Sequence, residues 1–192
     1  KTAGENPFFT EWDTPHGVPP FDKILPEHFM PAFERGMSLH EAEIDAITSN
    51  KDEATFENTI LAYDNAGQML AQTELVFGML CAAETNDRMQ ALQEQAMPLL
   101  AAHRDKIRLD DKLFVRVKEV YDRRAALGLD AEQMRLLQKT YDSFVRAGAL
   151  LDAEQKARLK EINGQLSLTA VKFGNNILAE NNNFVLELKS DE

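Results

Sequence analysis

Residues 129–148, L-D-A-E-Q-M-R-L-L-Q-K-T-Y-D-S-F-V-R-A-G, predict a helix and mark both of its ends. Asp130 stands three residues before Gln133, which is the spacing of a capping box, where each side chain bonds the backbone N–H of the other residue. Apolar residues then recur at three- and four-residue steps and so share one face of a helix. They are Met134, Leu137, Tyr141, Phe144 and Ala147.

The opening phrase of this helix occurs a second time. Residues 151–155 again read L-D-A-E-Q and predict a second capped helix. Its apolar stripe consists of Leu159, Ile162, Leu166, Ala170, Phe173 and Ile177. Only the caps recur and the bodies differ, which indicates two helices and not a solenoid repeat. We expect the second helix to bury Phe173 against the first, so that Phe173→Ala would cost about 3–5 kcal/mol of stability.

Four further helices are predicted upstream, at about residues 32–47, 56–84, 86–107 and 111–127. Pro98 lies inside the third and is expected to kink it, because proline removes one helical hydrogen bond and crowds the preceding turn. Gly128 fits the position after the last turn of the fourth. Residues 26–183 are therefore predicted to form one helical domain of about six helices.

The two ends of the chain differ from this helical body. Five of the seven prolines lie within the first 26 residues, interspersed with Phe8, Phe9, Trp12 and Phe21. This composition predicts an extended strap over residues 1–25 whose aromatic side chains insert into grooves of the body. At the other end, Phe184, Leu186 and Leu188 recur at every second position, which is the period of a strand over residues 184–192.

A single strand leaves its backbone donors and acceptors unpaired. Its partner is therefore expected beyond Glu192 or in another molecule. The predicted fold class is all-α, with an N-terminal strap and one unpaired C-terminal strand.

Charge and hydropathy exclude two classes of partner. The chain has 32 acidic and 21 basic residues, a formal net charge of −11, which repels phosphate backbones and anionic lipids. Its longest apolar run, residues 75–83, is nine residues, far short of the roughly 20 that a membrane helix needs. Neither nucleic acid nor a membrane is predicted as a partner. Cys81 lies in this run and is predicted to be a core residue.

No zinc motif is present in the sequence. An H-E-x-x-H helix binds zinc through two histidines one turn apart, and its glutamate activates water. The pair His40-Glu41 has Ile44 where the second histidine would stand. His16, His28 and His103 are too far apart in sequence to form such a pair.

Other polar residues have structural interpretations. Asp110-Asp111 and the pair Glu41 and Glu43 are interpreted as helix caps and solvated faces, because an acid–base dyad needs carboxylates that converge in a cleft. His28 and His103 are interpreted as hydrogen-bonded histidines at helix ends. No residue of the chain is therefore assigned a catalytic, cofactor-binding or metal-ligating role.

A series of short words runs along nearly the whole chain. They are N-P-F-F at 6–9, P-P-F-D-K-I at 19–24, P-E-H-F at 26–29, T-F-E-N-T at 55–59, T-N-D at 85–87, A-H-R-D at 102–105, L-F at 113–114, F-V-R-A-G-A at 144–149 and K-F at 172–173. In this order they resemble a zinc metallopeptidase family that includes bacterial peptidyl-dipeptidases, oligopeptidase A and thimet oligopeptidase. The wording A-H-x-D at 102–105 and F-V-x-A-G-A at 144–149 is closer to the peptidyl-dipeptidases.

This resemblance implies a division of labour. In the family, an N-terminal helical region forms one wall of a deep channel above a separate zinc-bearing domain. The resemblance thus implies that the parent protein releases C-terminal dipeptides from short unstructured peptides, using zinc held by ligands outside this chain. The partners of the chain would be its own C-terminal catalytic domain, reached through the strand at 184–192, and those peptides. Alone, the chain would be inactive.

Three points stay open at this stage. The parent could be an oligopeptidase A-type endopeptidase, which cuts internal bonds of short peptides. The helix pattern is equally compatible with an adaptor that binds partner proteins through a groove. The bacterial cytoplasm and the periplasm are both possible locations.

Overall fold

The computed structural model describes residues 5–187. Within this range every regular element is a helix and no strand is present, so the prediction of an all-α fold is confirmed. Of the predicted strand, residues 184–187 follow the last helix without forming a strand, and residues 188–192 lie outside the described range. Residues 1–4 of the predicted strap also lie outside it.

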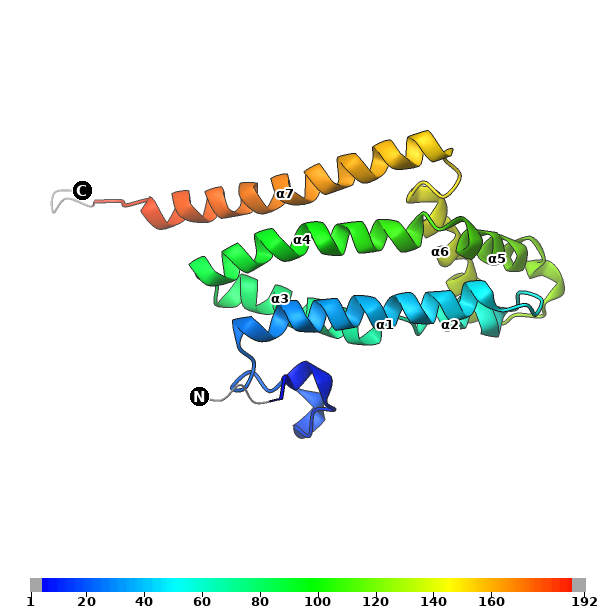
Figure 1. The fold of residues 1–192 in the computed structure, drawn as a ribbon, viewed down its shortest axis with the longest axis horizontal. Helices are drawn as coiled ribbons and strands as arrows, with labels where there is room; N and C mark the ends of the chain where they lie inside the picture. Colours follow the sequence, from blue (N-terminus) through cyan, green and yellow to red (C-terminus); the bar gives the residue numbers. More distant parts are fainter. Residues whose placement is uncertain (1–4, 188–192) are drawn as a thin grey trace.

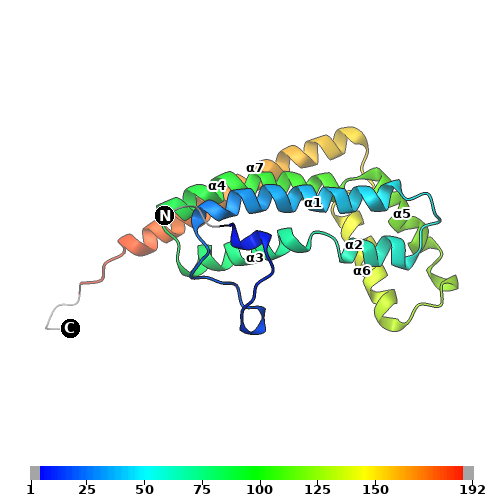
Figure 2. The same cartoon turned by 60° about the horizontal axis from the view of Figure 1, so that its bottom comes forward.

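The helices form an elongated bundle (Figures 1 and 2). α1 (Phe29–Ser49) packs on α3 (Gln68–Ala83) and on α4 (Asp87–Arg108), and α7 (Ala153–Asn183) packs on the other side of α4. α5 (Asp111–Asp122) and α6 (Ala131–Arg146) pack together at one end of the bundle. The chain therefore builds a layer of α1 and α3, a middle helix α4 and an outer helix α7.

The prediction of one helix over residues 56–84 is wrong. The segment divides into a π-helical turn at Phe56–Leu61, the short α2 (Ala62–Asp64) and α3. The break lies at Gly67, whose φ of 73° falls in the left-handed region that favours glycine. Glu43 of α1 accepts a hydrogen bond of 2.6 Å from the Gly67 N–H, and a Cβ on Gly67 would lie 2.8 Å from Nδ1 of His40. The turn at Gly67 therefore lies so close to α1 that it needs glycine, and the predicted helix is divided there.

The remaining helices follow the predicted pattern with small differences. α4 runs through Pro98 as one helix. α5 is shorter than predicted, because a 3-10 turn at Arg124–Ala126 precedes Gly128, where φ is 63°. Both predicted capping boxes form. In α6, the Gln133 N–H donates to Asp130 at 2.9 Å, and in α7 the Gln155 N–H donates to Asp152 at 2.8 Å.

Two buried apolar clusters stabilise the bundle, and α1 contributes to both. One cluster joins the C-terminal half of α1 to α5 and α6, and includes the fully buried Leu113, Leu137 and Phe144. The other joins its N-terminal half to α3 and α4, and includes Phe29, Phe33, Phe77 and Leu100. Burial of side chains of this size supplies the main favourable term in folding.

The N-terminal segment packs on the second cluster, as predicted for a strap. It contains 3-10 turns at Pro7–Phe9, Pro15–Gly17 and Pro26–His28. The Phe8 ring is buried, with its centroid 5.3 Å from that of Phe29, and Trp12 is half-buried beside Phe8. Phe21 differs from the prediction because it remains exposed.

The predicted packing of the last helix is wrong. α7 packs mainly along α4, not against α6, and Phe173 is 66% exposed. Asn163 of α7 donates to Asp105 of α4 at 2.8 Å, and Val171, about two turns further along α7, is buried. The face of α7 that contacts α4 is therefore about one residue, or roughly 100°, away from the predicted apolar stripe.

Candidate functional site

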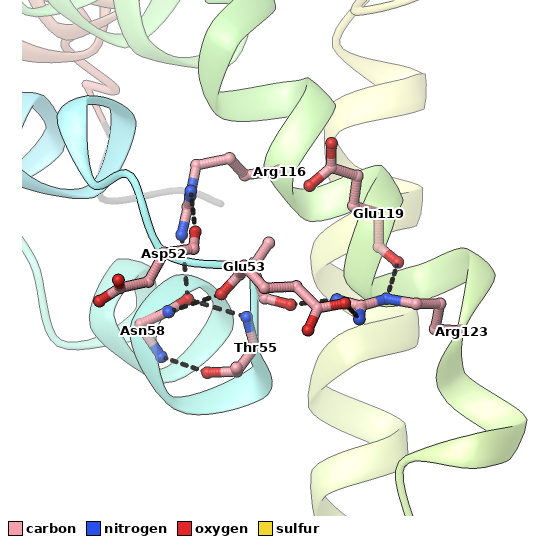
Figure 3. Close-up of polar contacts among 8 residues, drawn as sticks. Asp52, Glu53, Thr55, Asn58, Arg116, Glu119 and Arg123 are labelled. Atoms are coloured by element: carbon pink, nitrogen blue, oxygen red, sulfur yellow. Dashed lines mark hydrogen bonds and ion pairs between the residues drawn. The ribbon is translucent and has the colours of Figure 1, made fainter.

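A buried arginine fixes the loop after α1 (Figure 3). Arg116 of α5 is 9% exposed. Its guanidinium donates to the carbonyl oxygens of Asn50 and Asp52 at 3.0 and 3.2 Å, and to Oδ1 of Asn58 at 3.1 Å. Hydrogen bonds from a charged group to otherwise unpaired carbonyls are stronger than neutral ones. Arg116 thus holds residues 50–58 against α5.

Arg123 extends this network at the end of α5 (Figure 3). Its guanidinium pairs with Glu53 and donates to the carbonyl of Ala54, while Nε donates to the carbonyl of Glu119 at 3.3 Å. Figure 3 shows the two arginines approaching the loop from positions about two helical turns apart, with Arg123 at the C-cap of α5. We call this network of Arg116, Arg123 and residues 50–58 the clamp.

The word T-F-E-N-T at 55–59 is a part of that clamp. Thr55 is the N-cap of the π-helical turn, and it exchanges hydrogen bonds with Asn58 at 2.8 and 3.1 Å. Oδ1 of Asn58 also accepts from Arg116, and its Nδ2 donates to the Glu53 carbonyl at 2.9 Å. A π-helical turn can mark a functional site, but here Thr55, Asn58 and Thr59 make hydrogen bonds within the fold, and Glu57 is exposed.

His28 also has a structural role. Its Nδ1 accepts from the Leu25 N–H at 3.1 Å, and its carbonyl accepts from Asn6 at 2.8 Å. These bonds close the turn that begins α1 and attach the strap to it. The interpretation of His28 as a hydrogen-bonded histidine at a helix end is therefore confirmed.

His103 differs from its prediction because it lies inside α4 and not at a helix end. Its side chain is 3% exposed, and its Nε2 lies 3.1 Å from Nδ1 of His40 on α1. Its other nitrogen, Nδ1, lies 3.5 Å from a carboxylate oxygen of Glu41, which also pairs with Lys106 at 2.7 Å. The structure thus joins two histidines that are 63 residues apart in sequence.

The histidine pair lies beside a small cavity. The cavity has a volume of about 210 Å³ and is lined by residues of α1, α3 and α4 together with Tyr63 and Gly67. Burial lowers the pKa of both His40 and His103 below the usual value for histidine. Both rings are therefore neutral near pH 7, so one can donate to the other.

The position of each histidine within an apolar stripe is a sequence signal for this pair. His40 follows Phe33 and precedes Ile44 on the inward face of α1, and His103 stands between Leu100 and Ile107 on the inward face of α4. A histidine within an apolar stripe is expected to point into the core, where it needs a partner. The identity of that partner depends on how the helices cross.

The other residues weighed as site candidates are dispersed. Ile44, three positions after Glu41, is buried in the core. Asp110 is the N-cap of α5, accepting from the Leu113 N–H at 2.8 Å, and Asp111 pairs with Lys156 of α7. Cys81 is half-buried, and burial raises the pKa of its thiol. His16 is exposed in the strap.

Across residues 5–187, no group of three or more His, Cys, Asp or Glu side chains is arranged to hold a metal ion. That this chain carries no catalytic or zinc-binding residue stays a prediction. No helix in the described part of the chain is long and apolar enough to cross a membrane.

The most prominent surface feature is an exposed apolar stripe on α7. Its large side chains are 42–66% exposed and recur at steps of four or seven residues, so they share the face that does not contact α4. We define the α7 stripe as Ile162, Leu166, Phe173 and Ile177. The residues that follow the helix, Phe184, Val185 and Leu186, are 70–83% exposed. Exposed apolar surface of this extent indicates a contact with another protein segment.

Comparisons with known proteins agree with the resemblance seen in the sequence. The chain is 41% identical over 92% of its length to a dipeptidyl carboxypeptidase of Escherichia coli, and 38% identical over 91% to that of Salmonella typhimurium. It is 24% identical over 86% of its length to oligopeptidase A of Escherichia coli. No family model matches the chain. The chain spans about a quarter of the length of these relatives, 24–26%.

Proposed function

The chain is homologous to an N-terminal region of the bacterial dipeptidyl carboxypeptidases, and on that premise we propose that it is the non-catalytic helical wall of such a peptidase. The parent protein would release dipeptides from the C-terminus of short unstructured peptides. Zinc would be held by ligands outside this chain. The described residues would shape access to the substrate channel and contribute no group to the chemistry.

The observation that carries this proposal is the α7 stripe. α7 packs a polar face on α4 and exposes Leu166 and Phe173. Its apolar face is therefore not covered by any other part of residues 5–187. The relatives are about four times as long as the matched region, so a protein like them has a further part that can cover the stripe. The named relatives are peptidases, which makes that part the expected place of the catalytic groups.

The polar clusters support a wall and not a reaction centre. Arg116 donates to the backbone carbonyls of Asn50 and Asp52 and to Asn58, and Arg123 donates to two backbone carbonyls and pairs with Glu53. Both rings of the histidine pair are engaged between α1 and α4. These contacts stiffen the bundle, and a stiff wall is what a channel that excludes folded proteins requires.

The main test compares the parent protein with a form that lacks residues 1–192. Both are incubated with an N-blocked oligopeptide, with and without a chelator, and the products are identified by mass spectrometry. We expect the parent to release C-terminal dipeptides in a chelator-sensitive reaction, and the truncated form to lose selectivity or stability while it retains its metal. Internal cleavage would instead indicate an oligopeptidase A-type enzyme. Peptidase activity of the 192-residue chain alone would refute the proposal that the catalytic groups lie outside this chain.

A matched pair of variants tests the role of the α7 stripe. Leu166 and Leu150 are the same residue type and are 62% and 63% exposed, but Leu150 lies in the turn before α7. Leu166→Glu in the parent is expected to weaken its stability or selectivity, because it places a charge in the covered interface. Leu150→Glu is the control. Equal behaviour of the two variants would show that the stripe is not covered in the parent, and binding of separate proteins would favour the adaptor.

A further inference from the structure

We propose that the contact between His40 and His103 is a pH-sensitive latch, closed at neutral pH and released on acidification. The latch joins α1 to α4 through one hydrogen bond of 3.1 Å between Nδ1 of His40 and Nε2 of His103. The turn at Gly67 closes over it, since a Cβ there would lie 2.8 Å from the His40 ring. Three separate segments therefore meet at this one pair.

The geometry requires at least one neutral ring. A hydrogen bond between two imidazoles needs an N–H on one nitrogen and a lone pair on the other. When both rings are protonated, two N–H groups and two positive charges face each other at a separation of 3.1 Å. The contact then becomes repulsive, and α1 and α4 must move apart or the rings must rotate away.

The charged groups around the pair nearly balance one another. The acidic neighbours are Glu41 and Glu43 on α1 and Glu74 on α3. Each is engaged: Glu41 pairs with Lys106 at 2.7 Å, Glu43 accepts from the Gly67 N–H at 2.6 Å, and Glu74 pairs with Arg104 at 3.0 Å.

The other neighbours are Arg108, which also lines the cavity, and Tyr63, whose pKa is raised by burial so that the phenol stays neutral. Three carboxylates thus stand against three cationic side chains. Burial is left as the deciding effect, and it disfavours the charged form of a histidine.

The direction of the pH effect follows from this burial. The pKa of His40 is lowered mainly by burial and then by the charge of His103, and that of His103 is lowered mainly by burial. In the unfolded chain both would titrate near their ordinary value of 6.5. The unfolded state therefore binds protons first as the pH falls. The stabilising effect of the neutral pair is complete above about pH 6.5 and decreases as the pH falls below that value.

Release of the latch would loosen the bundle beside the 210 Å³ cavity. His40, Gly67 and His103 all line this cavity, so their separation would enlarge it. The second apolar cluster adjoins the cavity through Leu70, which is buried and also lines the cavity. The expected result is local loosening between α1 and α4 and not global unfolding.

Thermal unfolding of three proteins tests the latch: the wild-type chain, His40→Gln, and the control His16→Asn. His16 is exposed and far from the pair, and asparagine tolerates its φ of 59°. Between about pH 7.5 and 5.5, we expect the midpoint of the wild type and of His16→Asn to fall by about 2–4 °C more than that of His40→Gln. An equal fall in all three proteins would overturn the proposal.

A measurement on the wild type keeps the proposal testable if His40→Gln does not fold. Nuclear magnetic resonance of the imidazole C–H groups follows the protonation of each histidine. We expect His40 and His103 to titrate below the ordinary histidine value of 6.5, and the amide signals of α1 and α4 near them to shift over the same pH range. Titration of both rings at or above that value, or no change in those amides, would show that there is no latch.

Discussion

α6 and α7 share the same five-residue phrase at their N-terminal ends, but their apolar faces lie in opposite environments. Both helices start with L-D-A-E-Q and form the same capping box. In α6 the predicted apolar face is buried, with Leu137 and Phe144 both at 0% exposure. In α7 the predicted face is exposed, with Leu166 at 62% and Phe173 at 66%. A cap and a periodic stripe therefore specify a helix and its apolar face, but they do not specify which neighbour covers that face.

The largest expected difference between the two helices is in their phenylalanines. Phe144→Ala should reduce the free energy of unfolding by about 3–5 kcal/mol, because the ring is fully buried between Tyr63 and Phe114 and its removal leaves a cavity. Denaturant unfolding of the 192-residue chain measures this loss. A loss below about 1 kcal/mol would show that the α6 core is loosely packed and would remove the contrast.

The next largest expected effect separates an arginine of α5, which contacts the loop at residues 50–58, from an exposed arginine of α7. Arg116→Met should cost about 2–3 kcal/mol, because the three part-buried hydrogen bonds that the charged guanidinium donates to residues 50–58 are lost. The control is Arg158→Met on α7, where the side chain is 64% exposed and the loss should stay within about 0.5 kcal/mol. Equal losses in denaturant melts would mean that the clamp does not stabilise the loop.

A smaller effect is expected from the identical caps. Asp130→Ala should cost about 1 kcal/mol, since it removes the bond that the Gln133 N–H makes and α6 is part of a buried core. Asp152→Ala removes the same bond from α7 but should appear mainly as faster hydrogen exchange in the first turn, residues 153–156. If both variants lowered global stability equally, α7 would be as firmly integrated as α6.

The smallest effect is expected at Phe173, and it would complete the comparison. Phe173→Ala should change the free energy of unfolding by less than about 0.5 kcal/mol, because the ring is mainly in solvent. The same denaturant melts as for Phe144→Ala provide the measurement. A loss of about 3 kcal/mol or more would place Phe173 in a core after all and would restore the original sequence prediction.

The family resemblance was also readable from the sequence. In the structure, the residues of the matching words make caps, core contacts and turns. T-F-E-N-T forms the cap and clamp at 55–59, and A-H-R-D contributes His103 and the Asp105 that bonds Asn163. In F-V-R-A-G-A, Phe144 is core and Gly148 has a φ of 100°.

The sequence by itself determined the elements whose causes are local. The capping boxes at Asp130 and Asp152 and the apolar periods of α1 and α6 depend on contacts within about four residues, so they can be read from the sequence alone.

Only the tertiary structure decided the break at Gly67, the pairing of His40 with His103 and the packing of α7 on α4. Each of these contacts joins residues that are far apart in sequence, so it depends on the way the helices cross. Glu43 and Gly67 are 24 positions apart, and His40 and His103 are 63 positions apart. Burial is a property of the assembled bundle, because an apolar side chain is stabilised only where another surface removes it from water.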